Sequence, residues 1–124
     1  MTRAQRAVLG ALSGGGRFLS AQEIHTQLRA GGDRTGLTSV YRALQSLAEA
    51  GDVDVLRADS GETVYRRCST ESHHHHLVCR ECGDTVEVAG RGVEQWAVRT
   101  AEAHGFRDVS HTVEVFGSCP RCAR

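Results

Sequence analysis

The sequence predicts an α+β protein in two parts, residues 1–68 and residues 73–124, joined by a hinge at residues 69–72. Apolar residues first recur at helical spacing, and strand-like alternation then replaces that spacing and surrounds one later helix. Between the two parts, the fifteen residues from Cys68 to Cys82 contain three cysteines and four consecutive histidines. So dense a set of metal-ligating side chains has no ordinary role in an apolar core, and it predicts metal binding.

Composition limits how the chain can be stabilised. Its 124 residues suit one average domain or two small ones, and 40% of them are hydrophobic with only 5% aromatic. A metal or an oligomer interface would help to hold such a modest core. The 15 basic residues, all arginine, balance 15 acidic ones, but the basic excess lies in residues 1–50. Overall charge therefore neither favours nor excludes a nucleic-acid partner.

The chain shows no apolar run long enough to cross a membrane, and its first residues lack the apolar core of a signal peptide. We therefore expect a cytoplasmic protein without a membrane partner. Thiols stay reduced in that compartment, so paired cysteines there bind metal more often than they form disulfides.

Three short helices are predicted before the first strand. The first covers residues 2–12, and the second starts at Ser20, where Ser20 and Glu23 match a capping box. The third follows Gly36 and stops at Gly51. The residues expected inward on this third helix are Val40, Ala43, Leu44 and Leu47.

Residues 53–57 and 62–66 alternate as strands around turn residues 59–61, which predicts a β-hairpin. Three helices followed by a hairpin is the pattern of a winged helix-turn-helix domain, whose third helix enters the major groove of DNA. An ordinary three-helix bundle with a solvated polar face is the alternative. The residues expected to contact DNA are Thr38, Ser39, Tyr41, Arg42 and Gln45.

The second part is predicted to be a small α/β domain. Residues 84–88 and 111–116 alternate as strands, and residues 92–104 form an amphipathic helix closed by Gly105. A sheet this small leaves an edge and an apolar face to bury. This suggests that the second part associates with a second copy of the chain.

Two CxxC pairs make a complete set of four thiolates, the tetrahedral environment of structural zinc. The four residues are Cys79, Cys82, Cys119 and Cys122. A redox dithiol or two unrelated cysteine pairs are the alternatives. In a reduced compartment the zinc interpretation is favoured.

The histidine run adds further metal ligands. In an extended segment, alternation sends His73 and His75 to one face and His74 and His76 to the other, so that one strand would feed two metal sites. Cys68, at the joint after the hairpin, can share a metal with one histidine pair, although a free cysteine is more often a small buried side chain.

Partners for the histidines come from both parts of the chain. Asp54, on the first strand of the hairpin, is placed to complete the site that uses Cys68, and Glu94 and His111 are the donors expected beside His73 and His75. Taken singly, each of the three would be assigned as a surface residue or a satisfied polar group.

The segments GLTSVYRALQSLAEAG at residues 36–51 and HHHHLVCREC at residues 73–82 resemble the ferric uptake regulator family, and its zinc uptake regulators in particular. The resemblance implies a homodimeric, metal-dependent repressor with an N-terminal DNA-binding domain and a C-terminal dimerisation domain. It implies structural zinc at Cys79, Cys82, Cys119 and Cys122; a sensing site of Asp54, Cys68, His74 and His76; and an additional site of His73, His75, Glu94 and His111.

Two departures from the iron-type pattern favour zinc. His75 replaces an acidic residue of the usual histidine motif, and Phe18 stands where many iron-type members have a ligating histidine. Nitrogen and sulfur ligands favour zinc over iron or manganese. We therefore expect two to three zinc ions per subunit and a zinc-loaded homodimer that binds pseudo-palindromic operators of zinc uptake genes.

Other functions remain open at this point. The same ligands could serve a regulator that senses iron, manganese, nickel or peroxide, or a zinc store or chaperone. A store would not require Ser39, Tyr41 and Arg42 on an outward helix face. A zinc hydrolase is not expected, because neither HExxH nor HxE…PCxxC is present. We expect no small-molecule substrate.

Overall fold

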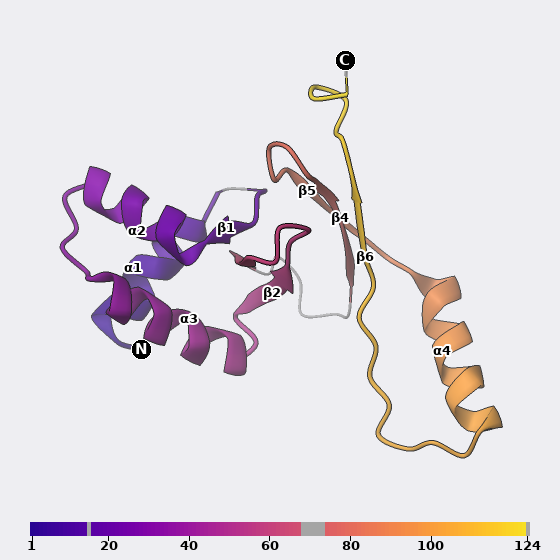
Figure 1. Ribbon diagram of the computed structural model, residues 1–124. Coiled ribbons are helices and arrows are strands. Elements are labelled where there is room, and N and C mark those ends of the chain that lie inside the picture. Colours follow the sequence, from indigo (N-terminus) through magenta and orange to yellow (C-terminus); the bar gives the residue numbers. More distant parts are fainter. Residues whose placement is uncertain (15, 68–73, 124) are drawn as a thin grey trace.

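The computed structural model describes residues 1–14, 16–67 and 74–123. Figure 1 shows two groups of elements side by side. The first has three helices and a small sheet, and the second has another sheet and one helix. The elements of the first group are α1 (Arg3–Leu12), β1 (Leu19–Ser20), α2 (Ala21–Ala30), α3 (Leu37–Glu49), β2 (Val53–Arg57) and β3 (Thr63–Arg67).

The predicted boundaries of the first three helices are confirmed to within two residues, with capping side chains at the starts of α1 and α2 and glycines around α3. Thr2 caps α1 through a capping box with Gln5. At α2, the backbone N–H of Glu23 donates to Ser20 Oγ over 3.1 Å, and Ser20 N–H donates to Glu23 Oε1 over 2.9 Å. Gly36 precedes α3, and Gly51 follows it with φ of +80°, a conformation that glycine adopts without strain.

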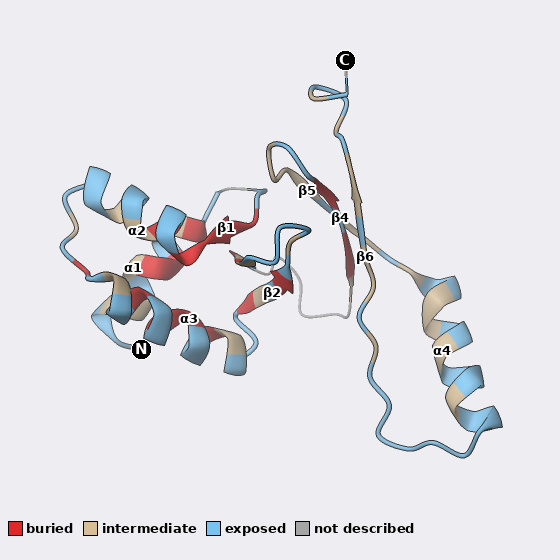
Figure 2. Ribbon diagram, in the orientation of Figure 1, coloured by how far each residue is buried: buried red, intermediate tan, exposed pale blue. Residues whose placement is uncertain are grey.

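The core of the first group lies between the three helices. Val8, Ile24, Val40 and Leu44 are fully buried, and Figure 2 shows the buried segments gathered there. The four residues predicted to face inward on α3 are all buried. Apolar burial of this kind is the main favourable term in folding.

The hairpin formed by β2 and β3 is confirmed, and the sheet has one more strand than predicted. The two-residue strand β1 pairs antiparallel with β3, giving the order β1-β3-β2. Two residues are too few to show alternation, so β1 had no signature in the sequence.

The second group contains β4 (His75–Cys79), β5 (Thr85–Val88), α4 (Arg91–Ala103) and β6 (Glu114–Gly117). β4 lies between β5, its antiparallel partner, and β6, its parallel partner. The expected strand at residues 111–116 was wrong at its start, since β6 begins at Glu114. The pairing of β6 with β4 starts at Glu114 and His76.

Helix α4 lies beside the second sheet and buries none of its 13 residues. The amphipathic pattern of this helix predicts one apolar stripe, made of Val93, Trp96, Ala97, Thr100 and Ala101. Val93, Ala97 and Ala101 are half-buried, whereas Thr100 is exposed and Trp96 is 62% exposed. Within the described part of one chain, therefore, nothing covers this stripe fully.

The two groups contact each other through polar and apolar residues. Phe18, Leu56 and Val64 from the first group pack with Val78 from β4 in a small buried cluster. Thr85 N–H donates to the carbonyl of Gly16 over 2.8 Å. Among the described residues, no helix is both long and apolar enough to span a membrane.

Candidate metal centres

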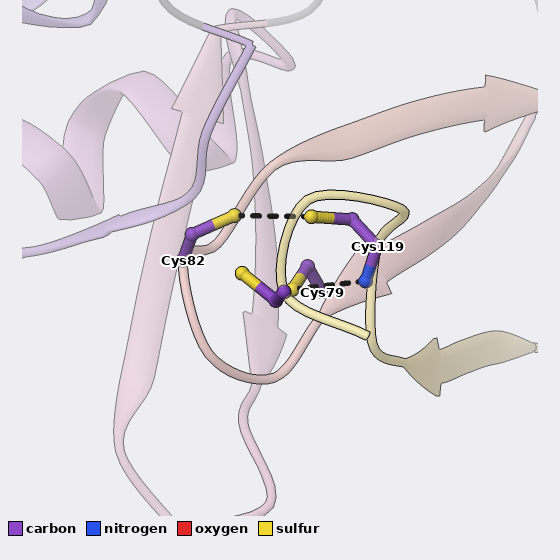
Figure 3. A group of neighbouring side chains, drawn as sticks. Cys79, Cys82 and Cys119 are labelled. Carbon is purple, nitrogen blue, oxygen red and sulfur yellow. Dashed lines mark hydrogen bonds between the residues drawn. The ribbon is translucent and has the colours of Figure 1, made fainter. Parts of the chain in front are cut away.

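The four cysteines of the two CxxC pairs meet at one end of the second sheet. Their four Sγ atoms all lie within 4.8 Å of one another, and Figure 3 shows the sulfurs of Cys82 and Cys119 facing each other. The distance between those two sulfurs is 3.7 Å. A Zn–S bond of about 2.3 Å in a tetrahedron places sulfurs about 3.8 Å apart. The cluster therefore fits structural zinc.

Tight turns bring the sulfurs together. The N–H of Gly83 donates to the carbonyl of Cys79 over 3.0 Å, and the N–H of Cys122 donates to the carbonyl of Cys119 over 2.9 Å. Gly83 has φ of +81°, which a side chain would strain. Each CxxC turn thus directs both of its sulfurs toward the other pair.

The thiols differ in how readily they ionise. Backbone N–H donors from Cys82 and Cys119 lower the pKa of Cys79 to about 6. Hydrogen bonding to the Cys119 thiol raises the pKa of Cys122 to about 12. Thiols must lose their protons to bind metal. A cation is therefore needed before all four sulfurs can carry charge together.

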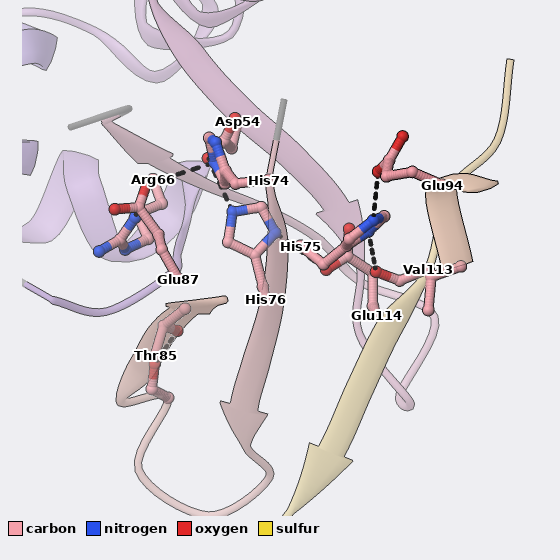
Figure 4. Close-up of polar contacts among 11 residues, drawn as sticks. Asp54, Arg66, His74, His75, His76, Thr85, Glu87, Glu94, Val113 and Glu114 are labelled. Atoms are coloured by element: carbon pink, nitrogen blue, oxygen red, sulfur yellow. Dashed lines mark hydrogen bonds and ion pairs between the residues drawn. The ribbon is translucent and has the colours of Figure 1, made fainter. Parts of the chain in front are cut away.

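A second cluster joins the two groups of elements. One oxygen, Asp54 Oδ2 on β2, lies 2.8 Å from His74 Nε2 and 2.8 Å from His76 Nε2. Glu87 Oε1 on β5 lies 3.3 Å from His74 Nε2. One atom from each of these four residues lies within 4.8 Å of the others, and Figure 4 shows them converging. Imidazole and carboxylate are both ligands of zinc.

His76 is held from both sides of its ring. Its Nδ1 lies 2.9 Å from Glu114 Oε2, and its ring meets that of Phe18 edge to face at 5.1 Å. Burial lowers the pKa of His76, but hydrogen bonds to Asp54 and Glu114 more than offset this, so the pKa lies above its ordinary value. A carboxylate on the far ring nitrogen orients an imidazole for metal binding.

A third cluster lies on the other side of β4. His75 Nε2 lies 2.8 Å from Glu94 Oε1, and His111 Nε2 lies 3.1 Å from the same oxygen. His75 Nδ1 lies 3.2 Å from the carbonyl of Val113. Because a carbonyl only accepts, Nδ1 carries the proton and Nε2 is left as the ligand atom.

Gly90 makes room for this third cluster. A Cβ atom at that position would lie 2.6 Å from Cδ2 of His75 and 3.1 Å from its Nε2. Any side chain at residue 90 would therefore push the His75 ring away from Glu94.

The described residues of the histidine run thus divide between two clusters: His74 and His76 lie on the Asp54 side, and His75 lies on the Glu94 side. Two of the expected ligands, Cys68 and His73, lie outside the described residues. Sequence reasoning missed Glu87 and Glu114. Their only signal is strand register, which pairs His76 with Glu87 on one side and with Glu114 on the other.

The residues expected to contact DNA lie on the outer face of α3. All five, namely Thr38, Ser39, Tyr41, Arg42 and Gln45, are exposed. Four of them line a shallow groove of about 500 Å³ that continues to Val55 and Tyr65 on the hairpin. The helix start and the hairpin therefore present one continuous surface.

The fold and the clusters together define a winged-helix protein with three candidate metal sites in its described residues. The model of the ferric uptake regulator family matches residues 1–116. The chain belongs to the ferric uptake regulator family.

Relatives within the family include zinc regulators. The chain is 56% identical over 121 residues to a "Zinc uptake regulation protein" of Mycobacterium tuberculosis, covering 98% of this chain and 92% of that one. A crystal structure of FurB from M. tuberculosis, described as a zinc uptake regulator, shares 55% identity over 97% of this chain and 92% of that chain, with a TM-score of 0.56. A zinc uptake regulator complexed with zinc and DNA is 28% identical over 98% of this chain and 82% of that chain, with a TM-score of 0.78.

Proposed function

We propose that the protein is a zinc-responsive transcriptional repressor. As a zinc-loaded homodimer in the cytoplasm, it binds pseudo-palindromic operators of zinc uptake genes. The observation that carries this proposal is the second cluster, where Asp54 of the winged-helix group meets His74 and His76 of the other group. The relatives named as zinc uptake regulators, one of them solved with zinc and DNA, support it.

The four-cysteine cluster is the structural site of this proposal. Zinc bound there supplies the positive charge that four neighbouring thiolates require. The chain between the two CxxC pairs contains β5, α4 and β6. Joining the pairs therefore fixes both ends of a segment that buries few residues by itself.

The second cluster is the sensing site, with Cys68 as a proposed further ligand. Asp54 and the two histidines approach each other only when the two groups of elements adopt one relative orientation. Any ligand that requires this approach stabilises that orientation. A differential affinity of about 3 kcal/mol changes operator occupancy by roughly a hundredfold.

The third cluster, His75 with Glu94 and His111, is an additional site, to which His73 would contribute. The three clusters together hold two to three zinc ions per subunit. Histidine and cysteine ligands favour zinc over manganese and iron. We assign no catalytic residue to any of the clusters.

DNA recognition is proposed for the outer face of α3. Arg42 has a fork of donors that suits a guanine edge or a phosphate. In a two-fold dimer, two such helices enter successive major grooves, and their spacing depends on how each winged-helix group is oriented. The uncovered stripe of α4, with Trp96, is the proposed dimer surface.

The test is binding of the purified full chain to genomic DNA fragments across buffered free zinc, with iron and manganese in parallel. We expect tight, sequence-selective binding that appears only as zinc rises. Equal activation by iron or manganese would assign the protein to another metal. Absence of selective binding with any metal would instead favour a zinc store or chaperone.

A further inference from the structure

Arg66 is a buried cation next to the second cluster. The residue lies on β3 and is only 8% exposed. Its Nη1 forms an ion pair with Glu87 Oε1 at 3.0 Å, and neither its Nη1 nor its Nε makes a hydrogen bond among the described residues. A buried guanidinium is costly unless a carboxylate compensates its charge. Glu87 is therefore the counter-ion that makes the burial of Arg66 possible.

The same Glu87 oxygen belongs to the second cluster. Glu87 Oε1 is one of the four atoms gathered around Asp54, and it lies 3.3 Å from His74 Nε2. One carboxylate oxygen thus lies between the Arg66 guanidinium and the proposed zinc site, as Figure 4 shows.

Strand register explains how this arrangement arises. Asp54 and Arg66 are direct partners across β2 and β3, and His76 and Glu87 are direct partners across β4 and β5. Direct partners in an antiparallel pair project from the same face. Two cross-strand pairs therefore face each other at the junction, with Asp54 opposite the histidines and Arg66 opposite Glu87.

We propose that Arg66 determines metal specificity by holding Glu87 as its counter-ion and so withholding that carboxylate from the metal. The proposal rests on the zinc-sensing function above. Manganese and iron(II) favour oxygen-rich sites with more ligands, whereas zinc favours four ligands with nitrogen and sulfur among them. An additional free carboxylate would shift the site toward the harder ions. Arginine stays protonated at every physiological pH, so the restraint is permanent.

The variant that tests this role is Arg66→Met, which keeps an unbranched apolar stem and removes the charge. Zinc and manganese affinities are measured on the full-length protein by chelator competition and by manganese EPR. We expect manganese affinity to rise by about tenfold or more relative to zinc, the size of effect that residues behind metal ligands exert. An unchanged ratio, or a ratio that moves further toward zinc, would overturn the proposal.

A double variant, Arg66→Met with Glu87→Gln, is the matched control. It removes the released carboxylate, so the zinc-to-manganese ratio should return to the wild-type value. If Arg66→Met alone does not fold, the double variant can still test the proposal, because it leaves neither the Arg66 charge nor the Glu87 charge buried. Zinc affinity within about tenfold of wild type supports the proposal; a larger loss shows that Glu87 is itself a required ligand and overturns it.

Failure of the proposed function is distinguishable from failure of this inference. Operator binding of the wild-type protein across buffered zinc tests the repressor. The metal ratio of the Arg66 variants tests the ion pair, whether or not DNA is bound.

Discussion

The two groups of elements differ in what holds them together. The winged-helix group buries Val8, Ile24, Val40 and Leu44 completely. The second group has a helix without one buried residue, and its buried side chains include His75 and His76. One half is thus stabilised by an apolar core. The other has little apolar core of its own, so we propose that bound metal and a second chain stabilise it.

The two groups also differ in how many large apolar side chains they leave exposed. Seven of the ten large hydrophobic side chains that are exposed in the described chain belong to residues 74–123. They are Leu77, Val86, Trp96, Val98, Phe106, Val109 and Val115. Exposed apolar residues gathered in one region mark an interaction surface. The second half is therefore the part whose stability should depend on metal and on association.

The largest effect is expected from removing the structural site. Cys82→Ser or Cys119→Ser should unfold the second half or leave the protein monomeric, because structural zinc contributes on the order of 10 kcal/mol to folding. Circular dichroism and analytical ultracentrifugation measure helix content and mass. A folded dimer with one of these cysteines replaced would refute the structural role.

A core variant should destabilise the first half by a smaller amount. Leu44→Ala removes a fully buried side chain and should cost about 2–5 kcal/mol of unfolding free energy. Urea titration of the zinc-loaded protein measures this cost. Zinc content per chain should stay at the wild-type value. A loss of zinc would contradict the conclusion that the apolar core stabilises the first half independently of the metal clusters.

Breaking the junction between the halves should abolish regulation and spare the fold. Asp54→Ala removes the oxygen that meets both His74 and His76, and Cys68→Ser removes the proposed thiolate. Each should keep the dimer and lower zinc-dependent operator affinity by roughly a hundredfold. Wild-type affinity that still requires zinc would count against this sensing site.

Two glycine variants in the second half test whether Gly90 makes room for His75 at the third cluster. Gly90→Ala should displace His75 and weaken zinc binding at the third cluster by about tenfold, because its Cβ would lie 2.6 Å from the ring. Gly92→Ala is the control, since no described atom beyond its chain neighbours and its own helix backbone lies within 4 Å of its added Cβ. Calorimetric zinc titration separates the two, and equal affinities would exclude the steric role of Gly90.

The smallest effect is expected at an exposed ion pair. Arg80 Nε lies 2.6 Å from Asp59 Oδ2, but both side chains are 54% exposed. Asp59→Ala should therefore change the free energy of unfolding by less than about 1 kcal/mol. Thermal melts at low and high salt measure it. A larger loss would mean that this contact also fixes the orientation of the halves.

Features that depend on residues close together in the chain could be predicted from the sequence. Ser20 with Glu23, and the glycines at 36 and 51, fix helix ends through neighbours a few residues away. The four inward residues of α3 follow from helical spacing alone. The cysteine pairs were found because metal chemistry imposes a recognisable spacing.

What the sequence left undetermined depends on strand register. Glu87, Glu114 and Arg66 reach the second cluster because β4 pairs with β5 and β6 in one alignment, and β2 pairs with β3 in another. A shift of one residue would send each side chain to the opposite face. No local pattern records such an alignment between distant segments, so these residues had no signal along the chain.

The position of Trp96 has a practical consequence. It is the chain's only tryptophan, it lies on the uncovered stripe of α4, and Glu94 of the third cluster is two residues away on the same helix. Tryptophan fluorescence therefore reports on position 96 alone. The Trp96 indole, which contacts water in a single chain, would be shielded when two chains associate through this stripe. Emission wavelength therefore follows assembly without a label.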